Sequence, residues 1–370
     1  MVFCRINDIR QVNENMKIIF IIPNMAGGGT ERVISLLSDE YVKMGFEVAI
    51  MQFAGYEHAY NLNDKVEDFS VASQSNGNPI TMIKRLSNMR RYFKNNPDSC
   101  IFAFCVMGAV FSVIATWGMR RKILVGERNN PDIYNMKKLR NWAYKHAEKI
   151  TFQTSDGISY FPAWAADRAV VIPNPVDASM PERYIGIRSK RVVTVGRLHK
   201  QKNHMLLLNA FADFSNQFPE YELHIYGAGE LEQSLKERAE NLHISEKVIW
   251  HGFCADAREQ IRDAAMFVLS SDYEGISNSM LEALSMGIPT ISTDCPIGGA
   301  GIYITPEKSG ILVPVGDKKA MTDAMIRIAS DDEMAERLSV NATQIKDKYS
   351  VKHIAEEFLE AAGIELLSGG

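Results

Sequence analysis

The chain has 370 residues, 46% hydrophobic and 23% charged, which is the composition of a globular protein of about two domains rather than a disordered or fibrous one. Its formal net charge of −4 is too small to favour nucleic acid as a partner. The cysteines form no C-x-x-C or Cys/His pattern, so we expect a reducing cytoplasm and neither a disulfide framework nor a zinc site. They are Cys4, Cys100, Cys105, Cys254 and Cys295.

The first predicted element is a buried parallel strand at 17–23, with the sequence KIIFIIP. Residues 1–15 are polar and lack the apolar core of a secretory signal, so we expect an extension that can be disordered. A glycine loop at 27–29, a helix over 31–44 and a strand at 46–53 follow. Strand, glycine loop, helix and strand form a βαβ unit, from which doubly wound sheets are built.

Residues 101–119 carry no charge and could nearly span a bilayer. Gly108, however, divides the stretch into a strand-like and a helix-like half, and three basic residues follow at 120–122. We therefore predict a buried strand and a buried helix here.

The second half repeats the alternation. Strands are predicted at 191–195, 221–227, 248–252, 266–271 and 289–293, and helices at 204–218, 230–241, 258–264 and 279–286. The sequence IPNP, followed by polar residues, interrupts the pattern and is typical of a linker. The predicted fold is therefore α/β with two doubly wound domains. We assign residues 1–172 to an amino-terminal domain, 173–187 to the linker, 188–350 to a carboxyl-terminal domain and 351–370 to a last helix.

The densest candidate site lies in the sequence SSDYEGISNSMLEALSMGIP. Its loop holds Glu274, at the carboxyl end of a predicted strand, where open α/β sheets bind ligands. A helix begins near Asn278 or Ser279, and the unpaired N–H groups of a helix start bind phosphate. Glu282 lies on about the first turn. Ser279-x-x-Glu282 also fits a capping box, so a purely structural Glu282 and a solvated turn carboxylate at position 274 are the alternatives.

A second candidate is the loop VGRLHKQKN. Gly196 permits close backbone approach, and Arg197 and Lys202 together can hold a diphosphate. Two cations on an ordinary surface loop are the alternative.

The glycine loop with Gly28 and Gly29 is a third candidate, because backbone amides there can approach an anion closely. A tight turn is the alternative. Neither this loop nor the sequence GAG at 227–229 has the full G-x-G-x-x-G spacing, so we do not expect dinucleotide binding.

Together these segments resemble the large retaining glycosyltransferase family 4, whose GT-B architecture has two Rossmann-like domains facing across a cleft. This architecture also implies that the last helix, from about Val351 to Leu367, crosses back to the amino-terminal domain. Glu274 and Glu282 match the family's E-x7-E, and residues 196–203 match its G-R-L-x-x-x-K loop. GGGTERV resembles G-G-A-E-R-V, and residues 171–177 match V-I-P-N-x-V-D. Residues 126–131, GERNNP, look like the S-E-R-N-D-P segment of bacterial polysaccharide and glycan-assembly members, several of which use UDP-galactose or UDP-N-acetylhexosamine.

The resemblance implies roles for the matched residues. Arg197 and Lys202 would neutralise the donor diphosphate, Glu274 would contact the donor sugar and Glu282 the ribose. Glu127 is the best amino-domain candidate near the sugar and acceptor. Further donor-binding groups implied are Gly196, the amides of Asn278 and Ser279, and the glycines Gly28 and Gly29.

The implied reaction moves a hexose or N-acetylhexosamine from a nucleotide sugar, UDP by preference, to a saccharide acceptor that can be linked to polyprenyl diphosphate. The α configuration is kept. The transition state resembles an oxocarbenium ion, and the cations stabilise the departing diphosphate. We expect no metal and no cofactor, because these cations would do a metal's work. A nucleotide-sugar epimerase, an inverting GT-B transferase and a catalytically inactive sugar-nucleotide-binding protein remain alternatives.

One segment departs from the family. Where related sequences often read D-C-P-x-G-P-R-E, this chain reads D-C-P-I-G-G-A-G-I from Asp294. The missing Pro-Arg-Glu leaves the donor sugar open.

Basic residues are concentrated in the first half of the chain. Residues 1–180 hold 21 basic and 17 acidic side chains, whereas residues 181–370 hold 20 and 28. Residues 82–94 combine cations with apolar residues at helical spacing, which predicts contact with an anionic membrane on the inner face of the cell membrane. An ordinary surface helix is the alternative. The cations are Lys84, Arg85, Arg90, Arg91 and Lys94, with Arg120, Arg121, Lys122, Lys137, Lys138 and Arg140 beyond them.

Overall fold

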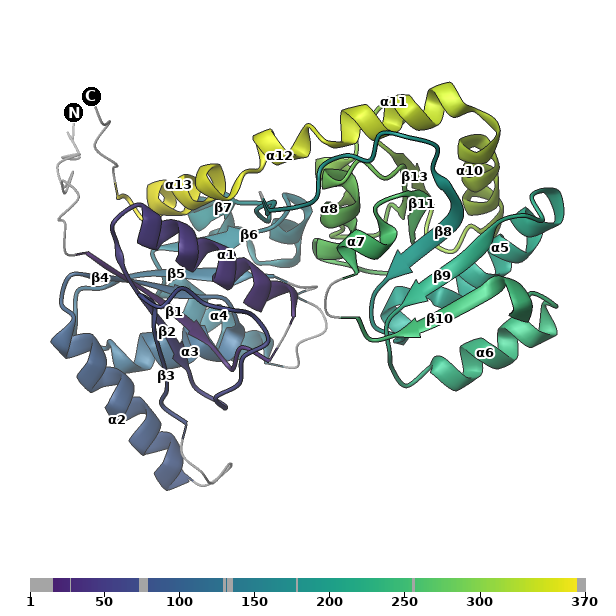
Figure 1. Ribbon diagram of the computed structural model, residues 1–370. Helices are drawn as coiled ribbons and strands as arrows, with labels where there is room; N and C mark the ends of the chain where they lie inside the picture. The colour runs from purple at the N-terminus through teal and green to yellow at the C-terminus, as the bar shows by residue number, and fades with distance from the viewer. Residues whose placement is uncertain are drawn as a thin grey trace, which may run out of the picture. The chain divides into compact units, whose positions relative to one another are not determined.

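The chain folds into two compact units, each built around its own parallel sheet (Figure 1). Unit 1 comprises Met1–Pro175 and Val351–Gly370, and unit 2 comprises Val176–Ser350. The computed structural model describes residues 16–26, 28–72, 79–128, 131, 136–177, 179–254 and 257–364. The predicted extension at 1–15 and part of GERNNP lie outside these residues.

Unit 1 has a seven-stranded sheet in the order β3-β2-β1-β4-β5-β6-β7, with every neighbouring pair parallel. The strands are β1 (Lys17–Ile22), β2 (Glu47–Gln52), β3 (Glu67–Ser70), β4 (Ser99–Ala103), β5 (Lys122–Glu127), β6 (Lys149–Phe152) and β7 (Ala169–Val171). The helices are α1 (Gly29–Lys43), α2 (Pro79–Asn95), α3 (Val106–Ala115), α4 (Lys137–Lys145) and α13 (Val351–Ala361), with short 3-10 helices at Asp156–Tyr160 and Ala163–Arg168.

Helices cover this sheet because its central strands are apolar on both faces. After Lys17, every residue of β1 is buried. Helix α3 packs between α2 and α4, while α1 packs with α13. The Tyr41 hydroxyl donates to the carbonyl of Ala355 at 3.1 Å, and the ring of Phe358 lies 5.7 Å from that of Phe102. The last helix, predicted from about Val351 to Leu367, ends at Ala361. Its contacts with α1 make it part of the core of unit 1.

The uncharged stretch at 101–119 forms the end of β4 and all of α3, as predicted, but the division falls before Gly108. Cys105 is the N-cap of α3, and its sulfur accepts from the N–H of Gly108 at 3.2 Å. A Cβ on Gly108 would lie 3.2 Å from the carbonyl oxygen of Ile21, so the glycine lets the helix start approach β1. Among the described residues, no helix has the length and apolar character needed to cross a bilayer.

Unit 2 has a six-stranded parallel sheet in the order β10-β9-β8-β11-β12-β13. The strands are β8 (Ser189–Val195), β9 (Glu222–Tyr226), β10 (Val248–Gly252), β11 (Ala264–Leu269), β12 (Thr290–Thr293) and β13 (Ile311–Val313). The helices are α5 (His204–Gln217), α6 (Glu232–Asn241), α7 (Arg258–Ile261), α8 (Asn278–Ser285), α9 (Ala300–Tyr303), α10 (Lys318–Ser330), α11 (Asp332–Ala342) and α12 (Ile345–Lys348), with 3-10 turns at Lys200–Lys202 and Ser245–Lys247.

The predicted alternation of strands and helices in this half is confirmed, and the ends shift by a few residues. The largest change concerns the helix predicted over 258–264, which ends at Ile261 because Ala264 already pairs with β8. Helices α5 and α10 pack together over the face that carries Met266 and Val268, and α8 packs on β11 and β12. This arrangement leaves the loops after β8 and β11 at one edge of the sheet.

Candidate functional site

The candidate site of unit 2 lies where the strand order reverses. From β8 the chain proceeds to β9 and β10 on one side, and β11, β12 and β13 extend on the other. Because β8 and β11 are parallel neighbours, their carboxyl ends meet at one edge. This reversal is the topological switch point at which open α/β sheets bind ligands. Both predicted loops, the one with Arg197 and the one with Glu274, begin here.

The loop after β8 is held by backbone hydrogen bonds, and the side chain of Arg197 is exposed on it. Gly196 N–H donates to the carbonyl of Tyr226 at 2.9 Å, and Leu198, fully buried, donates to Ala228 at 3.0 Å. Between them, Arg197 is exposed and makes no side-chain hydrogen bond or ion pair with the described part of the chain. Its guanidinium is therefore available to a ligand.

The GAG sequence after β9 supports this loop. A Cβ on Gly227 would lie 1.9 Å from the carbonyl oxygen of Gly196, and one on Gly229 would lie 2.5 Å from that of Leu198. Only glycine permits these approaches. The residues that sequence reasoning treated as a failed dinucleotide fingerprint thus hold the Arg197 loop in place.

Lys202 and Glu274 form the ion pair that joins the two loops. Lys202 Nζ lies 2.5 Å from Glu274 Oε2, and each side chain is only 15% exposed. The same carboxylate accepts from Ser271 Oγ at 3.0 Å and from Gln201 Nε2 at 3.3 Å. An ammonium has three N–H donors, so Lys202 can hold Glu274 and still reach an anion.

Further bonds tie the loops together behind this pair. The Asp272 N–H donates to the carbonyl of Gln201 at 2.9 Å, and Asn203 Nδ2 donates to Asp272 Oδ1 at 2.6 Å. Ser270 Oγ donates to the carbonyl of Lys202 at 2.8 Å. A site cross-linked in this way holds its charged groups at fixed positions, as binding of a transition state requires.

Helix α8 begins two residues earlier than the capping-box interpretation requires, so that interpretation is wrong. Ser277 is the N-cap, with extended backbone, and the Leu281 N–H donates to its carbonyl at 3.1 Å. Asn278 and Ser279 are consequently the first two helical residues, and Glu282 lies in the second turn. Ser279 Oγ lies 3.1 Å from Ser277 Oγ instead of capping the helix.

The segment that departs from the family packs directly against the Glu274 loop. Gly299 N–H donates to the carbonyl of Gly275 at 2.8 Å. Ile297, buried, has a φ of 65°, a left-handed conformation that a β-branched residue rarely adopts. Burial raises the pKa of the Cys295 thiol to about 11, and the charge of Glu274 adds to this shift. Sequence reasoning noted the departure but not this contact.

The predicted residues of unit 1 lie at the carboxyl ends of its strands. Gly28 is the N-cap of α1 and Gly29 its first residue. A Cβ on Gly28 would lie 2.5 Å from Glu31 Oε2, whose pKa is raised by burial. Glu127 is the last residue of β5, is 5% exposed and accepts from the Tyr144 hydroxyl at 3.3 Å. The structure thus gives this carboxylate a buried, hydrogen-bonded position.

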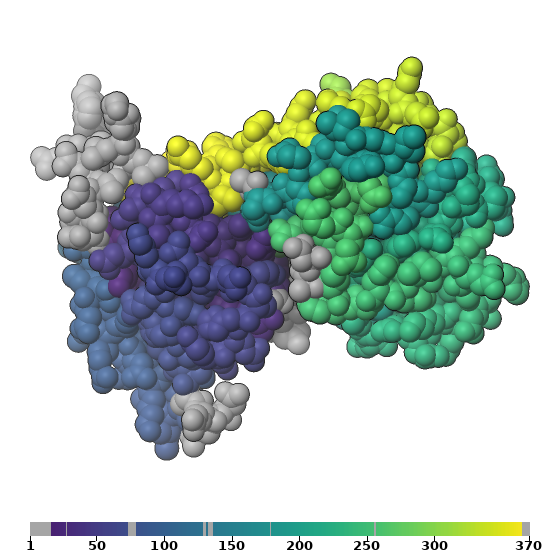
Figure 2. Space-filling model, viewed as in Figure 1, coloured from purple at the N-terminus to yellow at the C-terminus, as the bar shows by residue number. Residues whose placement is uncertain are grey.

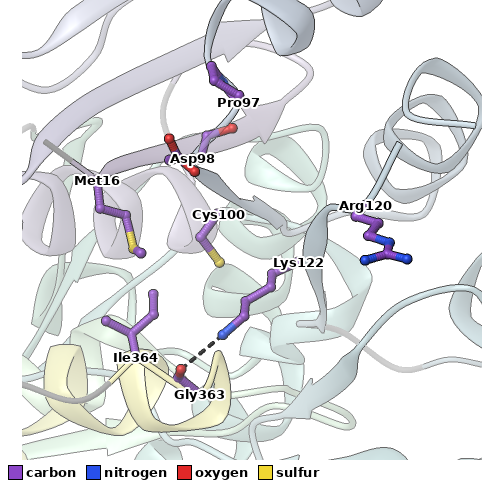
Figure 3. Close-up of a pocket in the computed structure, with 9 residues that line it drawn as sticks. Met16, Pro97, Asp98, Cys100, Arg120, Lys122, Gly363 and Ile364 are labelled. Atoms are coloured by element: carbon purple, nitrogen blue, oxygen red, sulfur yellow. Dashed lines mark hydrogen bonds between the residues drawn. The ribbon is translucent and has the colours of Figure 1, made fainter. Parts of the chain in front are cut away.

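A small pocket of about 50 Å³ lies elsewhere in unit 1 (Figure 3). Lys122 reaches across it and donates to the carbonyls of Ala362 and Gly363 at 2.7 and 2.9 Å, and Cys100 lines it. Since Cys100 and Lys122 lie at the amino ends of β4 and β5, the pocket is at the edge opposite Glu127. Its lysine caps the end of α13, which is a structural role.

No group of three His, Cys, Asp or Glu side chains in the described ranges is arranged to hold a metal ion.

Comparison with known proteins identifies relatives over nearly the whole chain. Residues 183–345 match the family described as "Glycosyl transferases group 1". The chain is 25% identical to the GalNAc-alpha-(1->4)-GalNAc-alpha-(1->3)-diNAcBac-PP-undecaprenol alpha-1,4-N-acetyl-D-galactosaminyltransferase of Campylobacter jejuni, over 93% of this chain and 98% of that one. It is 22% identical to the amylovoran biosynthesis glycosyltransferase AmsD of Erwinia amylovora, over 92% of this chain and 98% of that one.

Solved structures share the fold. HepE of Anabaena, in complex with UDP and glucose, superposes with a TM-score of 0.79 at 18% identity, covering 94% of this chain and 99% of that one. The lipopolysaccharide outer core galactosyltransferase WaaB superposes with a TM-score of 0.72 at 19% identity, covering 94% of this chain and 99% of that one. The chain is therefore a glycosyltransferase with the GT-B fold, and its residues 183–345 are similar to the group 1 glycosyl transferases.

Proposed function

We propose that this chain transfers a hexose or N-acetylhexosamine from a UDP-sugar to a saccharide carried on polyprenyl diphosphate, with retention of configuration. The observation that carries the proposal is the junction of two loops at the switch point. There Lys202 is paired with Glu274 at 2.5 Å, and Arg197 is exposed on the same loop. HepE was solved with UDP, and the Campylobacter relative is named for an undecaprenol-linked substrate, which supports this choice of donor and acceptor.

In this proposal the diphosphate of the donor lies over the ends of β8 and β11. Arg197 offers a planar fork of donors, and Lys202 offers an N–H that Glu274 does not occupy. The start of α8 adds the partial positive charge of a helix N-terminus beside Asn278 and Ser279. These groups would stabilise the negative charge that builds on the leaving UDP. One preorganised donor of this kind contributes on the order of 10²–10³ in rate.

The two carboxylates then have separate roles. Glu274, held by Lys202, Ser271 and Gln201, would orient the hydroxyls of the donor sugar. Glu282, on the second turn of α8, would bind the ribose. Retention requires that the acceptor hydroxyl enter on the face that UDP leaves. We propose that no metal ion takes part, because the two cations supply the charge that a metal would otherwise provide.

Unit 1 supplies the acceptor side in this proposal. Glu127 is held at the end of β5 by Tyr144, and would lie near the sugar and the acceptor hydroxyl. Gly28 and Gly29 would let a donor approach the backbone at the start of α1 closely.

Two measurements test the proposal. A thermal-shift screen of UDP-, GDP- and ADP-sugars should single out a UDP-sugar, because a bound ligand raises stability by RT ln(1 + [L]/Kd). The anomeric configuration of the product, read by NMR, should be α from an α-linked donor. A β-linked product would contradict retention, and stabilisation by GDP- or ADP-sugars alone would contradict the choice of UDP.

A further inference from the structure

The segment that follows β2 contains a histidine whose ring is held in place by a carboxylate. His58 Nδ1 lies 3.2 Å from Asp68 Oδ2, and the Asp68 side chain, on β3, is only 9% exposed. Gln52, the last residue of β2, donates from Nε2 to Asp68 Oδ1 at 2.9 Å. These three side chains form one hydrogen-bonded series that fixes the orientation of the imidazole.

The backbone around His58 is also held by hydrogen bonds. Gln52 Oε1 accepts from the N–H groups of Met25 at 3.2 Å and Glu57 at 3.3 Å. Met25 and His58 form a parallel bridge beyond the end of β1, and the Ala59 N–H donates to the carbonyl of Met25 at 2.8 Å. The loop that carries His58 therefore extends the sheet at its carboxyl edge.

The second nitrogen of this imidazole is available to a ligand. The His58 side chain is 36% exposed, and its Nε2 makes no hydrogen bond with any residue that the structure describes. Burial raises the pKa of the Asp68 carboxyl, and the hydrogen bond from Gln52 opposes this shift by stabilising the charged form. Because Nδ1 faces this carboxylate, Nδ1 carries the hydrogen of the neutral ring and Nε2 presents a lone pair. A hydroxyl group can therefore donate to Nε2.

An exposed aromatic ring lies beside this hydrogen-bond acceptor. Tyr56 is 58% exposed and meets the His58 ring edge-on, with centroids 4.6 Å apart and planes at 87°. Such a ring offers an apolar face on which the C–H groups of a sugar can pack. In the described part of the chain no lysine or arginine pairs with Asp68, so the cluster lacks the cations that a phosphate group needs. Figure 2 shows this part of unit 1, in indigo, at the surface.

The cluster shares its edge of the sheet with the predicted residues of unit 1. Tyr60, two residues after His58, donates from its hydroxyl to the carbonyl of Gly28 at 3.1 Å, at the start of α1. Glu127 ends β5, and the strand order β2-β1-β4-β5 separates β5 from β2 by three strand spacings, or about 14 Å (Figure 1). A single sugar ring does not span this distance.

We propose that Tyr56 and His58 form a subsite for a sugar residue of the acceptor that is remote from the residue receiving the transferred sugar. The remote sugar packs on the Tyr56 ring and donates a hydroxyl hydrogen bond to His58 Nε2. Asp68 is a positioning residue, since it acts through the imidazole. This inference rests on the proposed function and deepens it, because it makes the acceptor an uncharged oligosaccharide rather than a single sugar.

Binding in the absence of transfer tests the subsite directly. The full chain, with and without UDP, is titrated with uncharged hexose and N-acetylhexosamine trisaccharides and followed by NMR. We expect at least one trisaccharide to bind, and His58→Ala to weaken its affinity about three- to ten-fold through the loss of one hydrogen bond. Tyr56→Ala should weaken it about ten-fold, whereas Tyr56→Phe, which keeps the ring, should bind as the wild type does.

The matched control is another exposed histidine of unit 1 with a carboxylate partner. His353, on α13, is 53% exposed, and its Nε2 lies 3.4 Å from Glu357 Oε1. His353→Ala should bind trisaccharides as the wild type does. Thermal unfolding shows which variants are folded, and Tyr56→Ala, an exposed change outside the hydrogen-bonded series, decides the question if His58→Ala does not fold. Binding unchanged in Tyr56→Ala, binding weakened equally in His353→Ala, or a wild type that binds no trisaccharide would overturn the proposal.

Kinetics distinguish this subsite from a structural role and from the proposed function. His58→Ala should raise KM for the bound trisaccharide about three- to ten-fold with little change in kcat, because the hydrogen bond is present in the ground state and the transition state alike. KM for the matching monosaccharide should not change, and an equal rise on both acceptors would overturn the subsite. A wild type that binds trisaccharides through Tyr56 but transfers no sugar to any acceptor would leave the subsite standing and refute the proposed function.

Discussion

Replacing Arg197 and Lys202 one at a time distinguishes two effects of these cations. One is the binding of the donor diphosphate, and the other is the stability of the folded site. Arg197 is exposed and contacts no described carboxylate, so Arg197→Ala removes a cation without leaving a partner behind. Lys202→Ala instead removes the ammonium that lies 2.5 Å from Glu274, in a place where both side chains are 15% exposed. The two variants should therefore lose activity alike and stability differently.

The magnitudes follow from these contacts. Arg197→Ala should change the free energy of unfolding by no more than about 0.5 kcal/mol, because an exposed side chain without partners is lost. Lys202→Ala should lower it by about 1.5–3 kcal/mol, since a charge-assisted bond to a mostly buried carboxylate disappears and only Ser271 and Gln201 still donate to Glu274. Each variant should lower kcat about 10²–10³-fold if each cation stabilises the leaving diphosphate.

Urea unfolding and steady-state kinetics with a UDP-sugar and a water-soluble acceptor measure both quantities. Lys200→Ala, a change to an exposed lysine of the same loop, is the control and should retain activity and stability. Arg197→Ala with wild-type kcat would refute the assignment of the diphosphate to this loop. Lys202→Ala with unchanged stability would mean that the ion pair contributes nothing to the fold.

Three further changes have defined outcomes. His243 is exposed just after α6 and has a left-handed φ of 56°. His243→Gly should therefore raise the free energy of unfolding, measured in urea, by about 1 kcal/mol, and a decrease would contradict the left-handed geometry. Burial lowers the pKa of His204 to about 4, so the unfolded chain takes up the proton first and stability falls from about pH 6.5 toward pH 4. His204→Leu should remove up to about 3 kcal/mol of that decline, measured by unfolding at pH 7 and pH 4.5. Ser279→Ala should alter stability by less than about 0.5 kcal/mol, whereas a residue that capped α8 would cost about 1 kcal/mol.

The strands and helices could be predicted from the local sequence pattern. A parallel strand buried on both faces is a continuous apolar run, and a helix buried on one face has apolar residues at helical spacing. Positions whose residue type is determined by a close contact between two backbone segments show no such pattern. Gly108 was interpreted as a break between elements, yet it lies inside α3, where the missing Cβ lets the helix contact β1. Ser279 had the residue type and spacing of a cap, but Ser277 occupies that position.

The candidate site was predictable as two loops but not as one cluster. The sequence places Arg197 and Lys202 after one strand and Glu274 after another, and the parallel pairing of β8 with β11 brings them together. That Lys202 bonds Glu274, 72 residues away, depends on strand order, which periodicity does not specify. The need for glycine at position 227 could not be predicted either, since the backbone that a side chain there would meet, at Gly196, belongs to another loop.

The departure from the family at Asp294 gains a physical meaning from this cluster. At the place of the family's arginine the chain has Ala300, which is 5% exposed at the start of α9, so a long side chain would have to displace its neighbours. A Cβ on Gly299 would lie 2.3 Å from Ile276, two residues from Glu274. Ile297 holds a left-handed conformation that costs about 1–2 kcal/mol, and its buried side chain offsets this cost. The altered segment is thus packed as a unit against the loop that would orient the donor sugar. Any difference in sugar preference from relatives that carry Pro-Arg-Glu should originate here, in the shape of the Glu274 loop, rather than in the cations that hold the diphosphate.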